Sequence, residues 1–296
     1  MKDYFKDYHP AVNLIYFALV ISFSMVMIHP LAQIVALIGA LGYFIGAEGK
    51  KALGFVLKIC LPTLFLTALV NPIFNHEGET ILCYLGGKNP LTLESIFYGL
   101  GSCLMLVTVV LWFSSFSRVM SSDKFIYLFG KLAPALSLVL SMSLRLVPKF
   151  KNQAQKVAEA QKCIGRDLSS GGIWQKIKTA TVIFSVMITW ALENAIESSD
   201  SMKSRGYGLK GRTSFSIYTV DEQDKYTLIW LLFCGLFLMA GSIVGAFEFD
   251  YFPSIAYRDF DMTTIPFYFV YFALCITPSV LNFAKEKKWK TLYSRI

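Results

Sequence analysis

Six apolar stretches, each about as long as a lipid bilayer is thick, dominate this sequence. An α-helix needs roughly 20 residues to cross a hydrocarbon core of about 30 Å. The stretches lack charge in their middles and cover residues 11–28, 31–47, 53–74, 95–116, 226–247 and 264–284. A hydrophobic fraction of 55% and a mean hydropathy of +0.52 are typical of membrane proteins and exclude disorder and a secreted disulfide scaffold. We therefore predict an all-α polytopic membrane protein with about six transmembrane helices.

Charged residues are distributed unevenly between these stretches, and their distribution predicts the topology. With a cytoplasmic N-terminus and six crossings, 26 of the 28 basic residues lie inside, and only Lys88 and Arg258 lie outside. Seven of the 20 acidic residues lie outside. This bias satisfies the positive-inside rule, so both termini are predicted to be cytoplasmic. The first stretch has no small-residue cleavage site and is expected to remain in the mature protein, a multi-pass protein of a prokaryotic plasma (cell inner) membrane.

Two further apolar stretches, residues 125–146 and 179–196, are long enough to span a membrane on length alone. If both crossed, the segment between them would carry seven basic residues to the outside. Lys131, Arg145 and Glu193 also lie within these stretches, and a charge at a helix centre costs roughly 2.5–3.5 kcal/mol on insertion scales. We predict that both form apolar helices at the inner interface, packed against each other and against the crossings.

The predicted organisation has three parts. Residues 1–116 form an N-terminal membrane region with four crossings, residues 117–225 form a cytoplasmic or interfacial domain, and residues 226–296 form two crossings and a basic tail. The middle part carries 13 basic residues between Arg145 and Lys225. It contains no metal-ligand spacing, glycine-rich phosphate loop or nucleophile elbow.

Two helices within the middle part are predicted to end in clusters of arginine and glycine. Apolar residues recur at helical spacing from Pro148 toward Gly165, and a second helix runs from near Trp174 to Gly206. Glycine suits the left-handed position after a helix, and Arg205 in the last turn is favoured by the helix dipole.

Four short runs in this region resemble the transmembrane T component of energy-coupling factor transporters, the CbiQ-like family. They are Arg145-Leu146-Val147-Pro148, residues 158–162, residues 191–193 and residues 201–208. The resemblance extends over most of the chain in the order of crossings and insertion. Its specific content is a pair of Ala-Arg-Gly motifs that mark the ends of the family's two crossed coupling helices.

The two motifs are matched unequally. Ser204-Arg205-Gly206 follows the pattern with serine in place of alanine. The first motif falls on Cys163-Ile164-Gly165, with isoleucine where arginine is expected, and Arg166 follows directly as the alternative source of the guanidinium. The resemblance implies that these residues contact the ATPases, supported by a second set: Arg145, Pro148, Gln161, Glu193 and Glu197.

The resemblance implies a function without catalysis in this chain. A T component joins two cytoplasmic ABC ATPases, as a homodimer or heterodimer, to a small membrane S component that captures a vitamin or a metal ion such as cobalt. The partner ATPases bind ATP and Mg²⁺, so no cofactor or metal is expected here. A guanidinium suits the contact because its planar fork binds carboxylates with two hydrogen bonds and keeps its charge.

Simpler interpretations of the same residues remain open. Arg205 and Arg166 could act only as helix-capping, positive-inside residues, and Arg145 as an interfacial side chain. Glu193 and Glu197 could form a solvated edge or contact lysines of the other helix. The six cysteines and three histidines show no ligand spacing and are interpreted as structural.

The composition of the insertion and of the crossings bears on other partners and functions. The basic insertion lacks the interleaved aromatic residues of a nucleic-acid interface, whereas contact with anionic lipid is expected. Two alternative functions remain. A membrane-embedded lipid or prenyl transferase needs clustered carboxylates, whereas the inner acidic residues are scattered. A stand-alone secondary transporter needs ionisable residues deep in the membrane, which the crossings lack.

Overall fold

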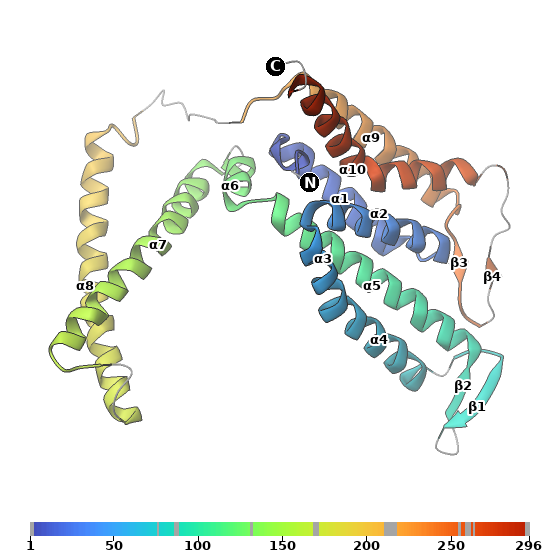
Figure 1. Ribbon diagram of the computed structural model, residues 1–296, viewed down its shortest axis with the longest axis horizontal. Helices are drawn as coiled ribbons and strands as arrows, with labels where there is room; N and C mark the ends of the chain where they lie inside the picture. The colour runs from blue at the N-terminus through green and yellow to red at the C-terminus, as the bar shows by residue number, and fades with distance from the viewer. Residues whose placement is uncertain are drawn as a thin grey trace. The chain divides into compact units, whose positions relative to one another are not determined.

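The computed structural model describes residues 3–75, 77–85, 89–130, 133–167, 172–209, 218–253, 256–257, 262 and 264–293. The chain divides into two compact units. The membrane unit comprises residues 1–124 and 218–296, and the crossed-helix unit comprises residues 125–217. Figure 1 shows that both are built almost entirely from helices. The predicted all-α class is confirmed.

The membrane unit contains the helices that match the predicted crossings. They are α1 (Pro10–Val26), α2 (Pro30–Glu48), α3 (Lys50–Phe55), a π-helical turn (Val56–Cys60), α4 (Leu61–Phe74), α5 (Leu93–Val119), α9 (Glu222–Ile243) and α10 (Ile265–Tyr293). Helices α1 and α2 begin in the same way, with proline at the first helical position. The preceding His9 and His29 each accept a hydrogen bond through Nδ1 from the backbone two residues later, at 3.2 Å. Two of the three histidines are thus helix caps.

Four short strands, which the sequence patterns did not predict, lie in the stretches assigned to the outer side. The strands β1 (Ile81–Leu85) and β2 (Asn89–Thr92) pair antiparallel, as do β3 (Phe249–Asp250) and β4 (Ala256–Tyr257). β2 leads directly into α5, and the Thr92 hydroxyl accepts a hydrogen bond from the Ser95 backbone at 3.3 Å. The hairpin therefore ends in the N-cap of a membrane helix.

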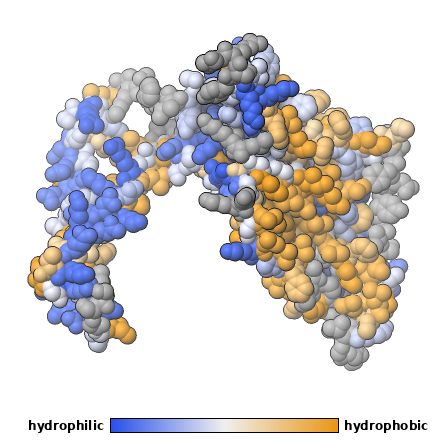
Figure 2. Space-filling model, in the orientation of Figure 1, coloured by the Kyte–Doolittle hydropathy of each residue, from blue (hydrophilic) through white to orange (hydrophobic). Residues whose placement is uncertain are grey.

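Length and composition alone identify five candidate membrane spans among the described helices: α2, α5, α8 (Ile173–Ser204), α9 and α10. Four of these coincide with predicted crossings. α8 contains the stretch 179–196, which the charge pattern assigns to the inner interface. α1 and residues 52–67 are shorter apolar helices. The polytopic architecture is supported, while the number of crossings and the orientation of the termini stay predictions. Figure 2 shows an extensive apolar surface over the membrane unit.

The core of the membrane unit is aromatic. Phe5, Tyr16, Phe17, Tyr43 and Trp112 are at most 2% exposed and meet mostly edge to face, as in the 5.9 Å contact between the rings of Tyr16 and Trp112. This is the arrangement that the quadrupole of aromatic rings favours. A core of this kind joins α1, α2 and α5 to the segment that precedes α1.

The segment before α1 is part of this core, although its sequence resembles a polar flank. Phe5 is fully buried, and its backbone N–H donates to Asn282 Oδ1 at 2.8 Å. The carboxylate of Asp3 accepts hydrogen bonds from Asn282 Nδ2 at 3.1 Å and from the Tyr43 hydroxyl at 3.0 Å. The first residues of the chain thereby connect α2 to α10.

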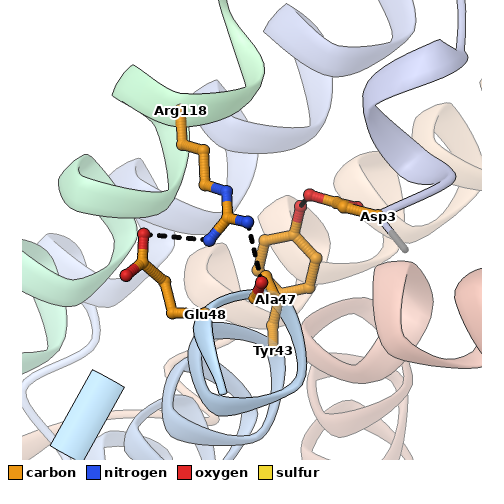
Figure 3. Close-up of polar contacts among 5 residues, drawn as sticks. All are labelled: Asp3, Tyr43, Ala47, Glu48 and Arg118. Atoms are coloured by element: carbon orange, nitrogen blue, oxygen red, sulfur yellow. Dashed lines mark hydrogen bonds and ion pairs between the residues drawn. The ribbon is translucent and has the colours of Figure 1, made fainter. Parts of the chain in front are cut away.

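A second polar contact joins the ends of α2 and α5. Arg118 Nη1 lies 2.9 Å from Glu48 Oε1, and Nη2 donates to the Ala47 carbonyl at 2.7 Å (Figure 3). The guanidinium thus satisfies one of the last carbonyls of α2 and pairs with its terminal acid. Figure 3 also shows the Tyr43 and Asp3 pair beside it.

Lys124 is a buried lysine at the point where the chain leaves the membrane unit. It lies in α6 (Ser122–Gly130), is 5% exposed, and donates from Nζ to the Lys6 carbonyl. With the Asn13 amide turned so that its oxygen faces the lysine, Oδ1 accepts a second bond at 2.7 Å. Burial, helped by the nearby Lys6 charge, lowers the pKa of Lys124 from 10.5 to about 8.

Two long helices make up most of the crossed-helix unit: α7 (Pro134–Cys163) and α8. The sequence pattern predicted an apolar helix over residues 125–146 and an amphipathic helix from Pro148. The structure instead has α7 running through Pro148, and the break comes after α6 ends at Gly130. Pro134 takes the first turn of α7, where its missing N–H costs nothing. Beyond Pro148, Lys149 and Phe150 pack against α8.

Candidate coupling site

The C-terminus of α8 carries the better-matched motif and ends in a regular Schellman turn. Arg205 is the C-cap, with φ −83° and ψ 8°, and Gly206 follows with a left-handed φ of 74°. The Gly206 N–H donates to the Lys203 carbonyl, and the Tyr207 N–H donates to the Met202 carbonyl, both at 3.0 Å. Glycine takes this φ without the cost that a Cβ imposes, so the predicted stop at Gly206 is confirmed.

The C-terminus of α7 ends in the same turn. Ile164 is the C-cap, with φ −89° and ψ 9°, and Gly165 has a φ of 80°. The Gly165 N–H donates to the Lys162 carbonyl and the Arg166 N–H to the Gln161 carbonyl, both at 3.0 Å. Cys163-Ile164-Gly165 therefore has the same backbone conformation as Ser204-Arg205-Gly206, residue for residue.

This equivalence places the two arginines differently on their helix ends. Arg205 is the C-cap of α8, whereas the C-cap of α7 is Ile164, which is 71% exposed. Arg166 takes the position two residues later, equivalent to Tyr207. Both arginines are exposed, and neither has an ion pair with another described residue. The neighbouring acid Asp167 lies 3.7 Å from Lys162 instead.

The predicted supporting residues have varied surroundings. Arg145, Glu193 and Glu197 are exposed, and no ion pair joins them to another described residue. Pro148 lies within α7. The Gln161 side-chain oxygen is buried without a hydrogen-bond partner among the described residues. The two glutamates therefore form an exposed edge, and contact with the lysines of α7 is not what the structure shows.

Residues that the sequence reasoning missed hold the two helices together. Phe150 of α7 and Trp190 of α8 meet edge to face, with ring centroids 5.2 Å apart and an interplanar angle of 82°. Lys149 Nζ donates to Asn194 Oδ1 at 2.7 Å and lies 5.7 Å from the centre of the Trp190 ring. An aromatic residue at helical spacing in each helix was the only sequence signal for this crossing point.

An apolar groove lies between α7 and α8 and was also missed. It encloses about 480 Å³. Its lining combines small and large apolar side chains with one lysine: Phe150, Lys151, Ala154, Ala180, Ile183, Phe184, Met187, Ile188 and Ala191. Phe184 is 66% exposed, so much of this apolar surface is uncovered in the isolated chain. Exposed apolar patches of this kind mark sites for a partner or a membrane.

Comparison with known proteins identifies the family. The family model described as "Cobalt transport protein", CbiQ, matches residues 2–216. The chain belongs to the CbiQ family. This confirms the resemblance drawn from the helix-end motifs and establishes a transport-related, multi-pass membrane protein of prokaryotic type.

Individual relatives agree with this assignment. A protein of Lactobacillus helveticus is 34% identical over 106 residues, covering 35% of this chain and 38% of that protein. One of Exiguobacterium sibiricum is 27% identical over 214 residues, covering 67% and 80%. One of Bacillus subtilis is 25% identical over 216 residues, covering 68% and 80%. Each is named "Energy-coupling factor transporter transmembrane protein EcfT".

Proposed function

We propose that this CbiQ-family chain is the transmembrane T component of an energy-coupling factor transporter. In this role it has no catalytic activity and joins two cytoplasmic ABC ATPases to a small S component that captures a vitamin or a metal ion. The observation that carries the proposal is the pair of matching helix ends, each presenting an exposed arginine without an acidic partner among the described residues. The names of its relatives support the same role.

The two helix ends are suited to contact with the ATPases. Arg205 and Arg166 offer planar guanidinium groups that can bind carboxylates with two hydrogen bonds. The Schellman turns hold each arginine in a defined backbone conformation, so little entropy is lost when a partner binds. The two helix ends then act as two contact points on one rigid pair of helices. Their residues are Ser204, Arg205, Gly206, Cys163, Ile164, Gly165 and Arg166.

The crossing point would convert motion of the ATPases into motion of the helices. The Phe150 and Trp190 rings and the bond from Lys149 to Asn194 connect α7 and α8 near the middle of each helix. When ATP brings the two ATPases together, helices joined in this way move as a rigid body. The apolar groove between them is the surface on which the S component would dock and reorient.

Charge reversal at one helix end tests the ATPase contact. We expect Arg205→Glu to abolish co-purification of the ATPases and substrate uptake while membrane insertion persists, because a glutamate repels the carboxylates that the guanidinium binds. Lys156→Glu, an equal charge change on the exposed surface of α7 away from its end, is the control and should retain both. Normal ATPase binding and uptake by Arg205→Glu would contradict the proposal.

The first helix end permits a more specific test. If Arg166 supplies the missing guanidinium, Arg166→Ala should weaken ATPase binding about ten- to hundred-fold, the equivalent of one charged hydrogen bond of about 1.5–3 kcal/mol. Adding Ile164→Arg to that variant should restore binding, because position 164 is equivalent to Arg205. Failure of Arg166→Ala to change binding would show that the α7 end makes its contact without a guanidinium.

A further inference from the structure

A second apolar groove lies in the membrane unit, which does not contain the two helix-end motifs. It runs between α9 and α10 and encloses about 520 Å³. Its lining is almost wholly apolar or aromatic: Tyr226, Thr227, Trp230, Phe269, Phe272, Ala273, Ile276, Thr277, Val280 and Leu281. We call this the α9–α10 groove. The opposite faces of both helices, with Leu231 and Leu274 fully buried, pack into the core, so the groove belongs to the outer surface of the unit.

Between its ends the groove offers no free polar partner to a ligand; the exposed Tyr226 hydroxyl lies at one end. The Thr277 hydroxyl donates to the Ala273 carbonyl at 2.7 Å and accepts from Trp230 Nε1 at 3.3 Å. The Thr227 hydroxyl donates to the Gln223 carbonyl at 2.8 Å. Because these groups are satisfied within the protein, an occupant must be apolar where it lies in the groove. Phe269 and Val280, which are 72% and 55% exposed, provide much of the uncovered surface.

The length of the groove matches one leaflet of a bilayer. From Phe269 to Leu281 the helix advances about 18 Å, at 1.5 Å per residue. Half of a 30 Å hydrocarbon core is about 15 Å. The hydrogen bond from Trp230 to Thr277 fixes the antiparallel register, so Tyr226 lies level with the Leu281 end. A tyrosine at that end has the position of an interfacial aromatic residue.

Two lysines continue the same stripe of α10 beyond the groove. Lys287 follows Phe269 by 18 residues, which is a whole number of helical turns, so it lies on the same line of the helix surface. Lys288 is one residue further and still lies within the width of the helix face that lines the groove. They lie about 9–11 Å beyond Leu281, at the depth of lipid headgroups. Both are exposed.

Among the described lysines at the C-terminal end of α10, these two have ammonium groups with no ion pair or ring contact. Lys285 lies over the Tyr8 ring at 4.0 Å, and Lys290 pairs with Glu286 at 2.9 Å. No described acid lies within ion-pair distance of Lys287 or Lys288. The start of α9, at the same end of the groove, carries the exposed acids Asp221 and Glu222 and the buried Asp224. Lys225, Lys285, Lys287 and Lys288 outnumber these three acids, so the rim of the groove keeps a small net positive charge.

We propose that the α9–α10 groove binds an anionic phospholipid, with an acyl chain along the groove and the phosphate at Lys287 and Lys288. Apolar lining, leaflet-length extent and a positive rim at headgroup depth together select this class of ligand over a neutral lipid. Each lysine near a membrane surface contributes about a five-fold preference for an anionic headgroup, so two give at most about twenty-five-fold.

Photocrosslinking in bilayers tests this site. The full chain, with any subunits that co-purify, is placed in phosphatidylcholine bilayers. Each bilayer contains one of two probe lipids with a diazirine on the acyl chain: a phosphatidylglycerol probe or a phosphatidylcholine probe. We expect peptides of the α9–α10 groove to be labelled about five- to twenty-five-fold more by the phosphatidylglycerol probe. The double variant Lys287→Gln/Lys288→Gln should remove this preference, and Lys156→Gln/Lys178→Gln, with the same change in net charge, should keep it.

Three results would overturn the proposal. Equal labelling by both probes would show ordinary annular lipid. A preference that survives Lys287→Gln/Lys288→Gln would place the headgroup elsewhere. Labelling by neither probe, together with crosslinks to a partner subunit, would show that a protein helix covers the groove. Both lysines are exposed, so the double variant is expected to fold, and its elution on size exclusion checks this.

Discussion

The crossing of α7 and α8 yields the most quantitative prediction. Trp190→Ala removes the edge-to-face pair with Phe150, worth about 0.5–1.5 kcal/mol, and the Lys149 contact with the ring, worth about 0.5–1 kcal/mol at an exposed site. The expected loss is therefore about 1–2.5 kcal/mol in the free energy that holds the two helices together. It corresponds to about five- to sixty-fold faster amide exchange in both helices near the crossing.

Hydrogen exchange of the full chain in detergent measures this effect. Trp174→Ala is the matched control, because Trp174 belongs to the same helix but is 83% exposed, and it should change exchange near the crossing little. A double-mutant cycle with Phe150→Ala should show a coupling of about 0.5–1.5 kcal/mol between the two rings. Additive effects of Trp190→Ala and Phe150→Ala, or equal effects of Trp174→Ala and Trp190→Ala, would show that this contact does not hold α7 and α8 together.

Three further outcomes are expected. Gly39→Leu should destabilise the membrane unit by about 1–3 kcal/mol, because a Cβ there would lie 2.6 Å from Cys275 Cβ, whereas Gly42→Leu has open space; thermal unfolding in detergent compares them. Gly206→Val should speed hydrogen exchange of the Tyr207 amide, because a φ of 74° costs a β-branched residue about 1–3 kcal/mol. Gly172→Val is the control and should leave this exchange unchanged, because Gly172 has a φ of −71° that valine adopts readily. The free energy of unfolding should rise between pH 8 and about 10, by at most about 3 kcal/mol. The pKa of Lys124 is about 8 in the folded chain and higher in the unfolded chain, so the unfolded chain binds more protons in this pH range. Lys124→Met should lose this rise, and an unchanged pH profile in that variant would contradict the assignment.

Local chemistry explains why the ends of α7 and α8 could be predicted from sequence. A glycine that follows an amphipathic pattern takes the left-handed conformation because it has no Cβ, and this depends on a few neighbouring residues. Gly165 and Gly206 both take it. The alignment of Ile164 with Arg205 came from the family resemblance, and the matching turns at the two helix ends agree with it. The start of α7 was predicted less well, because a proline usually marks a helix boundary, whereas α7 runs through Pro148 as far as Cys163.

Long-range contacts explain what could not be predicted. Phe5 and Asp3 lie in a segment that reads as a charged flank, yet they connect to Asn282, about 280 residues away in the chain. Lys124 likewise gives no sign of burial in its own sequence neighbourhood. No local pattern specifies such partners, since they depend on which helices become neighbours in the folded unit.

The sequence alone determined the membrane class, the predicted sidedness and the two helix-end motifs that led to the CbiQ family. These follow from residue composition and from spacing over a few residues, where hydrophobic transfer and backbone sterics act locally. Only the tertiary structure decided that Phe150 meets Trp190, that Lys149 bonds Asn194 rather than a glutamate, and that α9 and α10 form an apolar groove between them. Those facts depend on the register of one helix against another, which is set by packing across the whole unit.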